Sequence, residues 1–98
     1  MVKVIWSEQA LDDVESICFF ISRDSIQYAK SFAAKAFEAA DQLALFPKHG
    51  RKVPEINKEE IREVILGNYR IIHRVTATKV VILTIHHGAR LLDTAKLD

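Results

Sequence analysis

Apolar residues in the first half of the chain recur with the period of an α-helix. Ser7 is a good N-cap, and an apolar stripe follows it as far as a polar turn that begins at Arg23. Ser25 closes this turn as a fresh N-cap, and the second helix is predicted to run from there to about Phe46, where Pro47 ends it. Its stripe is mostly alanine, which lets the two helices approach closely as a hairpin. The first stripe is formed by Ala10, Val14, Ile17 and Ile21, with Leu11 and Cys18 at its edge.

Phe19 lies on the side of the first helix opposite to this stripe. At a helical turn of about 100° per residue, its ring projects roughly 180° away from Ala10, so we expect it at the surface. An exposed ring there either marks a patch that binds a partner or covers the end of the neighbouring helix.

The second half of the chain changes to the two-residue period of β-strands. Three runs, 61–66, 69–75 and 79–86 or 87, are separated by short turn sequences and predict an antiparallel meander. The last run has a wholly apolar face, which is expected to rest on the helices. That face consists of Val81, Leu83 and Ile85. Residues 47–60 show no regular period and are expected to form a loop, whereas the apolar stretch 2–6 suits a buried strand.

Together these elements predict an α+β fold in one domain over residues 1–98. A two-helix hairpin packs on a small antiparallel sheet, in the order β-α-α-β-β-β. A chain of 98 residues with 49% apolar and 28% charged side chains suits one small globular domain. The single cysteine, Cys18, excludes an intramolecular disulfide, and the apolar run at the N-terminus is too short for a signal peptide or a membrane span. We therefore expect a cytoplasmic location and no membrane contact.

Charge is distributed unevenly, although the net charge is only +1. Residues 1–47 carry four Lys or Arg and seven Asp or Glu, which gives −3, whereas residues 48–98 carry ten and six, which gives +4. The β-rich half would therefore attract an acidic partner, unless these side chains only form a solvated surface.

Arg70 stands in the predicted central strand, where an arginine needs a physical reason. Its stem could pack on the sheet while its head reaches solvent or a carboxylate such as Glu63. Alternatively, the guanidinium could clamp a phosphate or a carboxylate of a partner, since it forms bidentate pairs with both.

The four histidines raise the question of a metal site. Adjacent residues on a strand point to opposite faces, so His86 and His87 cannot ligate a metal from one side, and no Cys/His spacing is typical of zinc. The sequence also has no nucleophile elbow, Walker loop or dinucleotide-binding motif. We expect no metal and no other cofactor, and neither conventional hydrolase nor nucleotide-binding chemistry.

The order of the elements and several short motifs resemble the RelE/ParE family of toxins from prokaryotic type II toxin–antitoxin pairs. The resemblance spans residues 5–93 and implies a cognate antitoxin whose disordered segment folds across the toxin. The motifs are Phe46-Pro47 with Gly50-Arg51 and Val53-Pro54-Glu55, Ile61-Arg62-Glu63, Tyr69-Arg70-Ile71-Ile72-His73-Arg74-Val75, and His87-Gly88-Ala89-Arg90. A homodimer and a hetero-oligomer with the antitoxin both remain open.

Within this family the sequence is more similar to the ParE-like, plasmid-stabilisation branch. The proline–glycine–arginine loop and the His87–glycine pair followed by Arg90 are typical of that branch, whose members inhibit DNA gyrase by binding. The resemblance implies that Arg70, His87 and Arg90 contact the target and that the protein is not an enzyme. Two positions that are often basic in this branch hold Thr84 and Ala89 here.

The RelE-like branch implies an alternative function, ribosome-dependent cleavage of messenger RNA without a metal. Such a nuclease needs cations on the scissile phosphate and an acid and a base around it. Arginines would hold the phosphate, and a histidine would act as acid or base because imidazole titrates near neutrality. The candidate catalytic residues are Arg62, Arg70 and Arg90, with His73, His86 or His87. A lysine and a C-terminal tyrosine of RelE are replaced here by Val64 and Lys96.

A third possibility is an inactive relative that only binds its antitoxin. The helical hairpin and the exposed ring expected at Phe19 would supply the apolar surface for such a partner.

Overall fold

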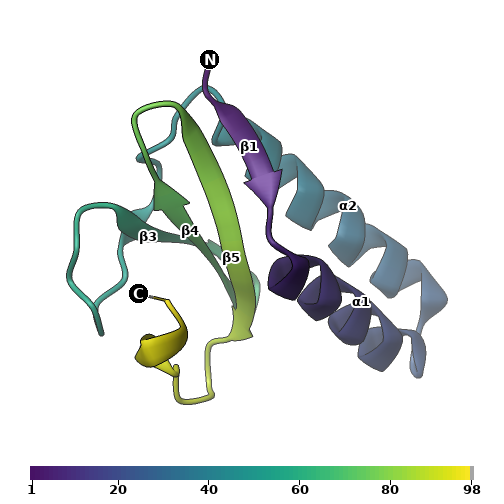
Figure 1. Cartoon of the computed structure of the whole chain (residues 1–98). Helices are drawn as coiled ribbons and strands as arrows, with labels where there is room; N and C mark the ends of the chain where they lie inside the picture. The colour runs from purple at the N-terminus through teal and green to yellow at the C-terminus, as the bar shows by residue number, and fades with distance from the viewer. Residues whose placement is uncertain (98) are drawn as a thin grey trace.

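The computed structural model describes residues 1–97 as two layers, with a helical hairpin on one face of a five-stranded sheet (Figure 1). Asp98, the last residue of the predicted domain, lies outside the described residues, and so does the side chain of Lys96. The predicted α+β class and the packing of the hairpin on the sheet are confirmed. The elements are β1 Lys3–Trp6, α1 Glu8–Ser22, α2 Ile26–Gln42, β2 Arg51–Lys52, β3 Ile61–Leu66, β4 Tyr69–Val75, β5 Lys79–His87 and the 3-10 helix η1 Thr94–Lys96.

The sheet has the strand order β1-β5-β4-β3-β2. Strands β3, β4 and β5 form the antiparallel meander that the sequence predicts. β1 runs parallel to β5, so the whole sheet is mixed rather than purely antiparallel. Parallel pairing is possible because the long connection between these strands gives the chain room to return to the same end of the sheet. β2 adds Arg51 and Lys52 at the other edge, so the loop prediction for 47–60 is wrong at these two residues.

Both helices begin at the expected serine caps. The hydroxyls of Ser7 and Ser25 each accept a hydrogen bond from the backbone N–H three residues later, at 3.0 and 3.1 Å. α2 ends at Gln42, earlier than the predicted end at about Phe46. The next residue, Leu43, is fully buried in the core, and the chain turns there toward the sheet. None of the helices in the described part of the chain is long and apolar enough to cross a membrane.

The main core lies between the helices and the inner face of the sheet, defined here as the face toward α1 and α2. The prediction that the helices cover Ile85 is confirmed, but the same prediction is wrong for Val81 and Leu83. The pairing of β5 with β4 shifts by one residue at Leu83, and this bulge reverses the alternation of side chains. The β5 residues in the main core are Val80, Ile82 and Ile85.

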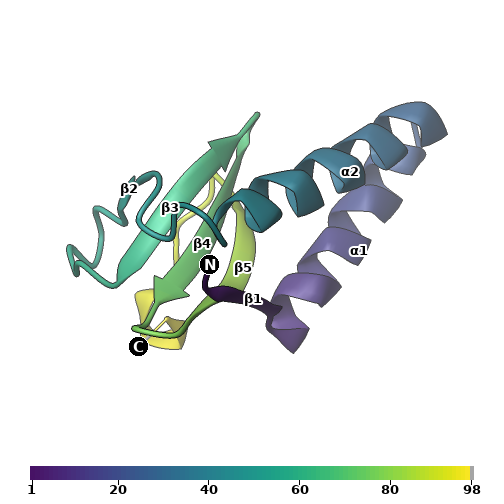
Figure 2. The same ribbon diagram turned by 90° about the horizontal axis from the view of Figure 1, so that it is seen from above.

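The opposite, outer face of the sheet carries a second and smaller core. Val53, from the loop that follows β2, and Leu97, near the C-terminus, pack there against Ile61 and Ile72. Nη2 of Arg74 donates a hydrogen bond to the carbonyl of Leu97 at 2.5 Å. Figure 2 shows the loop around β2 on the side of the sheet opposite to the helices. The outer face is therefore covered by two loop segments rather than by regular structure.

Candidate functional site

Arg70 of β4 lies on the outer face and is bound by two carboxylates of the same chain. Its Nη1 and Nη2 donate to the two oxygens of Glu55 at 2.7 Å each. Its Nε and Nη2 also donate to Glu63, and the shortest of these contacts is 2.6 Å. The side chain of Glu63 is fully buried, and that of Arg70 is only 10% exposed. The guanidinium is therefore neutralised within the protein.

Arg51 of β2 completes a cluster of four charges. Its Nη2 donates to Glu63 at 3.3 Å, so two arginines face two carboxylates and the cluster is neutral overall. The hydrogen bonds from Arg70 lower the pKa of the Glu55 carboxyl to about 2. The same contacts, first those with Glu55 and then those with Glu63, raise the pKa of Arg70. The contact between Arg70 and Glu55 is thus between ionised groups at neutral pH.

These contacts bear on the two sequence interpretations of Arg70. The first, in which the head reaches a carboxylate such as Glu63, is confirmed. The second partner, Glu55, was not predicted, because it lies 15 positions away in a segment without a regular period. In this structure Arg70 is not free to hold a phosphate or contact a target, so that role stays a prediction and requires Glu55 to leave.

Arg62 of β3 points to the inner side of the sheet, away from Arg70. Its guanidinium donates to the carbonyls of Lys48 and Gly50 at 3.1 and 3.2 Å and to the carboxylate of Glu59 at 3.2 Å. Only 13% of its side chain is exposed. Arg62 therefore fastens the loop before β2, and the structure does not bring it to a shared site with Arg70.

His73 lies opposite Arg62 in the pairing of β3 with β4 and is fully buried. Its Nε2–H donates to the carbonyl of Pro47 at 3.3 Å. Burial lowers the pKa of the imidazole, an effect that the Pro47 carbonyl partly opposes. The ring is therefore a neutral anchor for the loop at 47–50, and in this structure no substrate can reach it.

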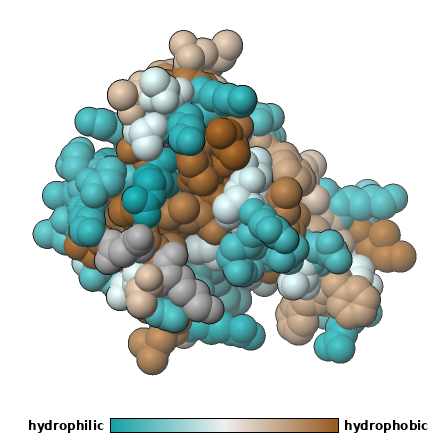
Figure 3. Space-filling view, viewed as in Figure 1, coloured by the Kyte–Doolittle hydropathy of each residue, from teal (hydrophilic) through white to brown (hydrophobic). Residues whose placement is uncertain are grey.

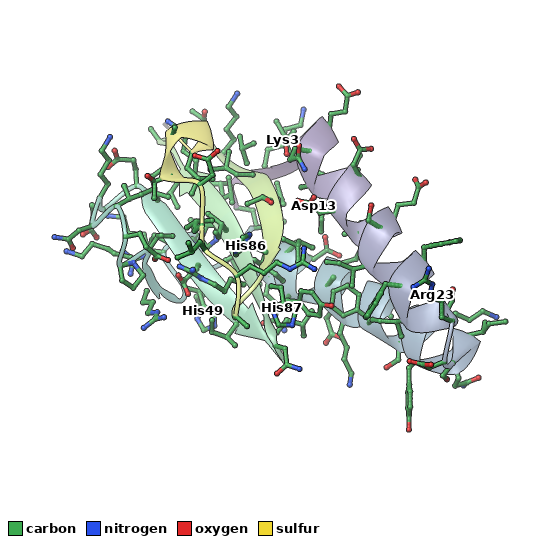
Figure 4. All side chains as sticks on the ribbon, turned by 90° about the horizontal axis from the view of Figure 1, so that it is seen from below. Lys3, Asp13, Arg23, His49, His86 and His87 are labelled. Carbon is green, nitrogen blue, oxygen red and sulfur yellow. The ribbon has the colours of Figure 1, made fainter. Side chains whose placement is uncertain are left out.

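The end of β5 places His86 and His87 on opposite faces of the sheet, as the sequence predicts (Figure 4). The Nε2–H of His86 donates to the carbonyl of Arg90 at 2.9 Å. Nδ1 of His87 accepts from the N–H of Ala89 at 3.1 Å, and its ring meets the ring of Tyr69 edge-on, with centroids 5.1 Å apart. Both imidazoles thus shape the turn that carries Arg90.

Arg90 is exposed at that turn, and its guanidinium makes no ion pair within residues 1–97. It is therefore the one member of the predicted arginine set that is presented to solvent in the described part of the chain. The predicted catalytic residues do not converge, because Arg62 and His73 lie on the inner side while Arg70 is enclosed by carboxylates.

A groove of about 940 Å³ runs between α1 and the second half of β5, and the turn with Arg90 forms its far wall. β1 pairs with β5 only as far as Ile82, so within residues 1–97 the edge of β5 beyond that residue has no neighbouring strand. There α1 lies beside the edge instead. Asp13 accepts hydrogen bonds from the backbone N–H of Ile85 at 3.1 Å and from the hydroxyl of Thr84 (Figure 4). Phe20 lines the groove from α1. No pattern in the sequence indicates this groove, since it depends on where β1 stops.

Large apolar side chains also reach the surface over the helical hairpin (Figure 3). Phe19 is 70% exposed, as the helical period predicts, and Phe20 beside it is 60% exposed.

Within residues 1–97 no three His, Cys, Asp or Glu side chains lie close enough together to hold a metal ion. The candidate surface therefore combines an exposed cation, a groove and apolar rings, which are features suited to binding a macromolecule.

Comparisons with known proteins agree on one family. The family model described as ParE toxin of type II toxin-antitoxin system, parDE, matches residues 4–92. Toxin RelE2 of Caulobacter vibrioides is 34% identical over 91 residues, which cover 93% of this chain and 100% of that protein. A solved chain described as the chromosomal ParDE TA system from P. aeruginosa has a TM-score of 0.73 at 19% identity, covering 89% of this chain and 96% of its own. At that identity the structural similarity concerns the fold alone.

Proposed function

The chain belongs to the ParE toxin family of type II toxin–antitoxin systems, and on that premise we propose that it inhibits DNA gyrase in the cytoplasm by binding to it. The observation that carries the proposal is the guanidinium of Arg90, which is exposed beside the groove at the end of β5 and makes no ion pair within residues 1–97. A cation that is free of internal partners can form charge-assisted hydrogen bonds with a carboxylate of a partner protein.

Binding is favoured over catalysis by the way in which polar groups are distributed. A general acid or base must come within hydrogen-bonding reach of the group that it serves. His73 is buried beneath the loop at Pro47, and the guanidinium of Arg62 donates its hydrogen bonds to carbonyls of the same loop. Arg70 is held by two carboxylates. Among the described residues, Arg62, Arg70 and His73 therefore do not form a site in which free arginines hold a phosphate beside an acid and a base.

His87 has a different role from Arg90 in this proposal. Its ring accepts the N–H of Ala89 and packs edge-on against Tyr69, so it fixes the turn rather than the target. Arg90 makes the contact, and His87 is a positioning residue for it. Arg70 supports the outer face through its ion pairs.

A supercoiling assay tests this function directly. Relaxed plasmid, ATP and purified gyrase are combined with increasing amounts of the toxin, in parallel with heat-unfolded toxin as a control for non-specific effects. We expect supercoiling to fall as the folded toxin approaches stoichiometry with gyrase. Undisturbed supercoiling at a large excess of folded toxin would rule out gyrase as the target.

Ribosome-dependent messenger RNA cleavage is the second candidate, and two observations favour it. The curated relative at 34% identity is named Toxin RelE2, and the turn that carries Arg90 holds two imidazoles, His86 against the carbonyl of Arg90 and His87 against the N–H of Ala89. Under this proposal His86 or His87 acts as acid or base, and Arg90 holds the phosphate. Primer extension on translated transcripts after induction would reveal discrete cuts, whereas intact transcripts during growth arrest would exclude it.

Membership of the family implies a cognate antitoxin as partner. We place that partner on the exposed rings of Phe19 and Phe20, which continue into the groove beside α1. If expression of the chain alone leaves growth unchanged while it still binds the product of the neighbouring gene, the chain is an inactive relative that only binds its antitoxin.

A further inference from the structure

A shallow pocket of about 620 Å³ lies where three distant parts of the chain meet. These are the residues before β1, the connection from α2 to β2 and the turn between β4 and β5, which come together at one end of the molecule (Figure 1). Apolar side chains form most of its walls, among them Val2, Leu45, Phe46 and Val75. The function proposed above uses none of these residues.

Backbone hydrogen bonds fix the walls of this pocket. The N–H groups of Leu45 and Phe46 both donate to the carbonyl of Gln42 at 3.1 Å, and the N–H of Val2 donates to the carbonyl of Ala44 at 3.0 Å. The side chains of Leu45 and Phe46 nevertheless remain 63% and 65% exposed. Since the backbone that carries them is already ordered, a partner that covers them loses little affinity to ordering.

Positive charge prevails around the pocket. Lys48 is exposed in its lining, makes no ion pair within residues 1–97, and has no acidic residue beside it in that lining. Lys79 is exposed next to it, because its backbone bonds to Thr76 of the lining. The carbonyl of Glu60, which accepts from the N–H of Val75, brings one negative charge near. A partner with carboxylates would therefore be attracted to this end of the molecule.

The shape and charge of the pocket select among possible occupants. A second copy fits poorly, because a symmetric dimer would bring the two copies of Lys48 toward each other. A small molecule also fits poorly, since such ligands need deep enclosure and several polar groups to orient them, and this pocket is shallow and mostly apolar. A peptide can place one apolar side chain in the pocket and a carboxylate on Lys48.

We propose that this pocket binds a segment of a partner protein in which one bulky apolar side chain is flanked by acidic residues. The apolar side chain packs on Leu45 and Phe46, and a carboxylate pairs with Lys48. Ala77 of the pocket precedes the first residue of β5, whereas Arg90 follows its last, so the strand separates the two surfaces. The pocket therefore does not depend on gyrase being the target, and the two proposals can fail separately.

Labelled peptides of one length test the chemistry of the occupant by fluorescence anisotropy. The first has a central phenylalanine between glutamates, the second has alanine in place of the phenylalanine, and the third has lysines in place of the glutamates. We expect the first peptide to bind about tenfold more tightly than either of the others. If the second or the third binds as tightly as the first, the proposal is wrong.

Two charge reversals place the peptide on the molecule. Lys48→Glu changes the lining of the pocket, while Lys35→Glu makes the same change at an exposed position of α2 outside it. We expect Lys48→Glu to weaken binding of the first peptide about tenfold and Lys35→Glu to change it less than about twofold. Equal losses in both variants would overturn the proposal, since net charge alone would then explain them.

Measurements on the unaltered chain avoid any effect of substitution on folding. When the first peptide is added, we expect the backbone amide signals of Val75 and Ala77 to shift in NMR spectra and that of Arg90 to stay unchanged. Saturation that leaves the signals of Val75 and Ala77 in place would contradict the site. Sedimentation of the chain alone should show a monomer; a dimer that Phe46→Ala abolishes would identify a second copy as the occupant and overturn the proposal.

Discussion

Replacement of Arg70 by methionine is the sharpest perturbation of the charge cluster. Methionine keeps an apolar stem of similar length and removes the guanidinium, so packing changes little while the carboxylate of Glu63 loses its closest partner at 2.6 Å. Glu63 is fully buried and would retain only the 3.3 Å contact with the exposed Arg51. The variant therefore leaves a poorly compensated charge inside the protein.

Breaking a buried ion pair by removing one partner costs several kcal/mol, and the remaining contact with Arg51 places this case at the lower end, about 3 kcal/mol. For a domain of this size, such a loss lowers the melting temperature by roughly 12 °C or more. Most of the cost comes from the stranded carboxylate. A second change, Glu63→Gln, should therefore recover about half of the loss in the double variant.

Urea unfolding followed by the fluorescence of Trp6, the single tryptophan of the chain, measures these differences. Trp6 packs against the main core, so its signal reports global unfolding. A loss of less than about 1 kcal/mol in the free energy of unfolding of Arg70→Met would refute a buried ionic cluster. The same holds if the double variant, Arg70→Met with Glu63→Gln, is no more stable than Arg70→Met alone.

The remaining predictions concern pH and the two glycines Gly50 and Gly67. The lowered pKa of His73 means that the unfolded chain takes up this proton first, so stability should fall as pH drops below about 6.5, and His73→Gln should flatten that fall in urea titrations. The pKa of Glu55, lowered from 4.5 to about 2, gives stability that is present above pH 4.5 and lost between 4.5 and 2; Glu55→Gln should remove this acid-dependent part. Gly50→Ala should prevent folding at 37 °C, since its φ is +89° and a Cβ would lie 2.1 Å from the carbonyl oxygen of Glu63. Gly67→Ala, at φ +59° with open space around it, should cost only about 1 kcal/mol, and thermal unfolding followed by circular dichroism compares the two variants.

The features that the sequence predicted well are set by neighbouring residues. The serine caps at Ser7 and Ser25 and the exposure of Phe19 follow from short-range rules of helix geometry, and the structure has all three. The meander follows from two-residue alternation and turn sequences. These signals act over a few positions and do not depend on tertiary contacts.

The features that the sequence missed depend on distant contacts. The bulge at Leu83 moved Val81 and Leu83 off the helix side, and alternation could not reveal it because both faces of β5 are rich in apolar residues. The partner of Arg70 in the loop, Glu55, has no pattern that links it to β4. The sequence therefore could not show that the guanidinium groups of Arg62 and Arg70 bind groups of the same chain, whereas that of Arg90 makes no ion pair within residues 1–97.

In the proposed function, the toxin contacts gyrase through Arg90 at the end of β5. The most direct test is the toxin concentration that half-inhibits supercoiling, measured for Arg90→Ala and for Arg23→Ala. Arg23 is an exposed arginine at the end of α1, remote from β5 (Figure 4), so it controls for the loss of one positive charge. We expect Arg90→Ala to raise the half-inhibiting toxin concentration about tenfold and Arg23→Ala to leave it unchanged. Equal inhibition by both variants and the wild type would contradict it.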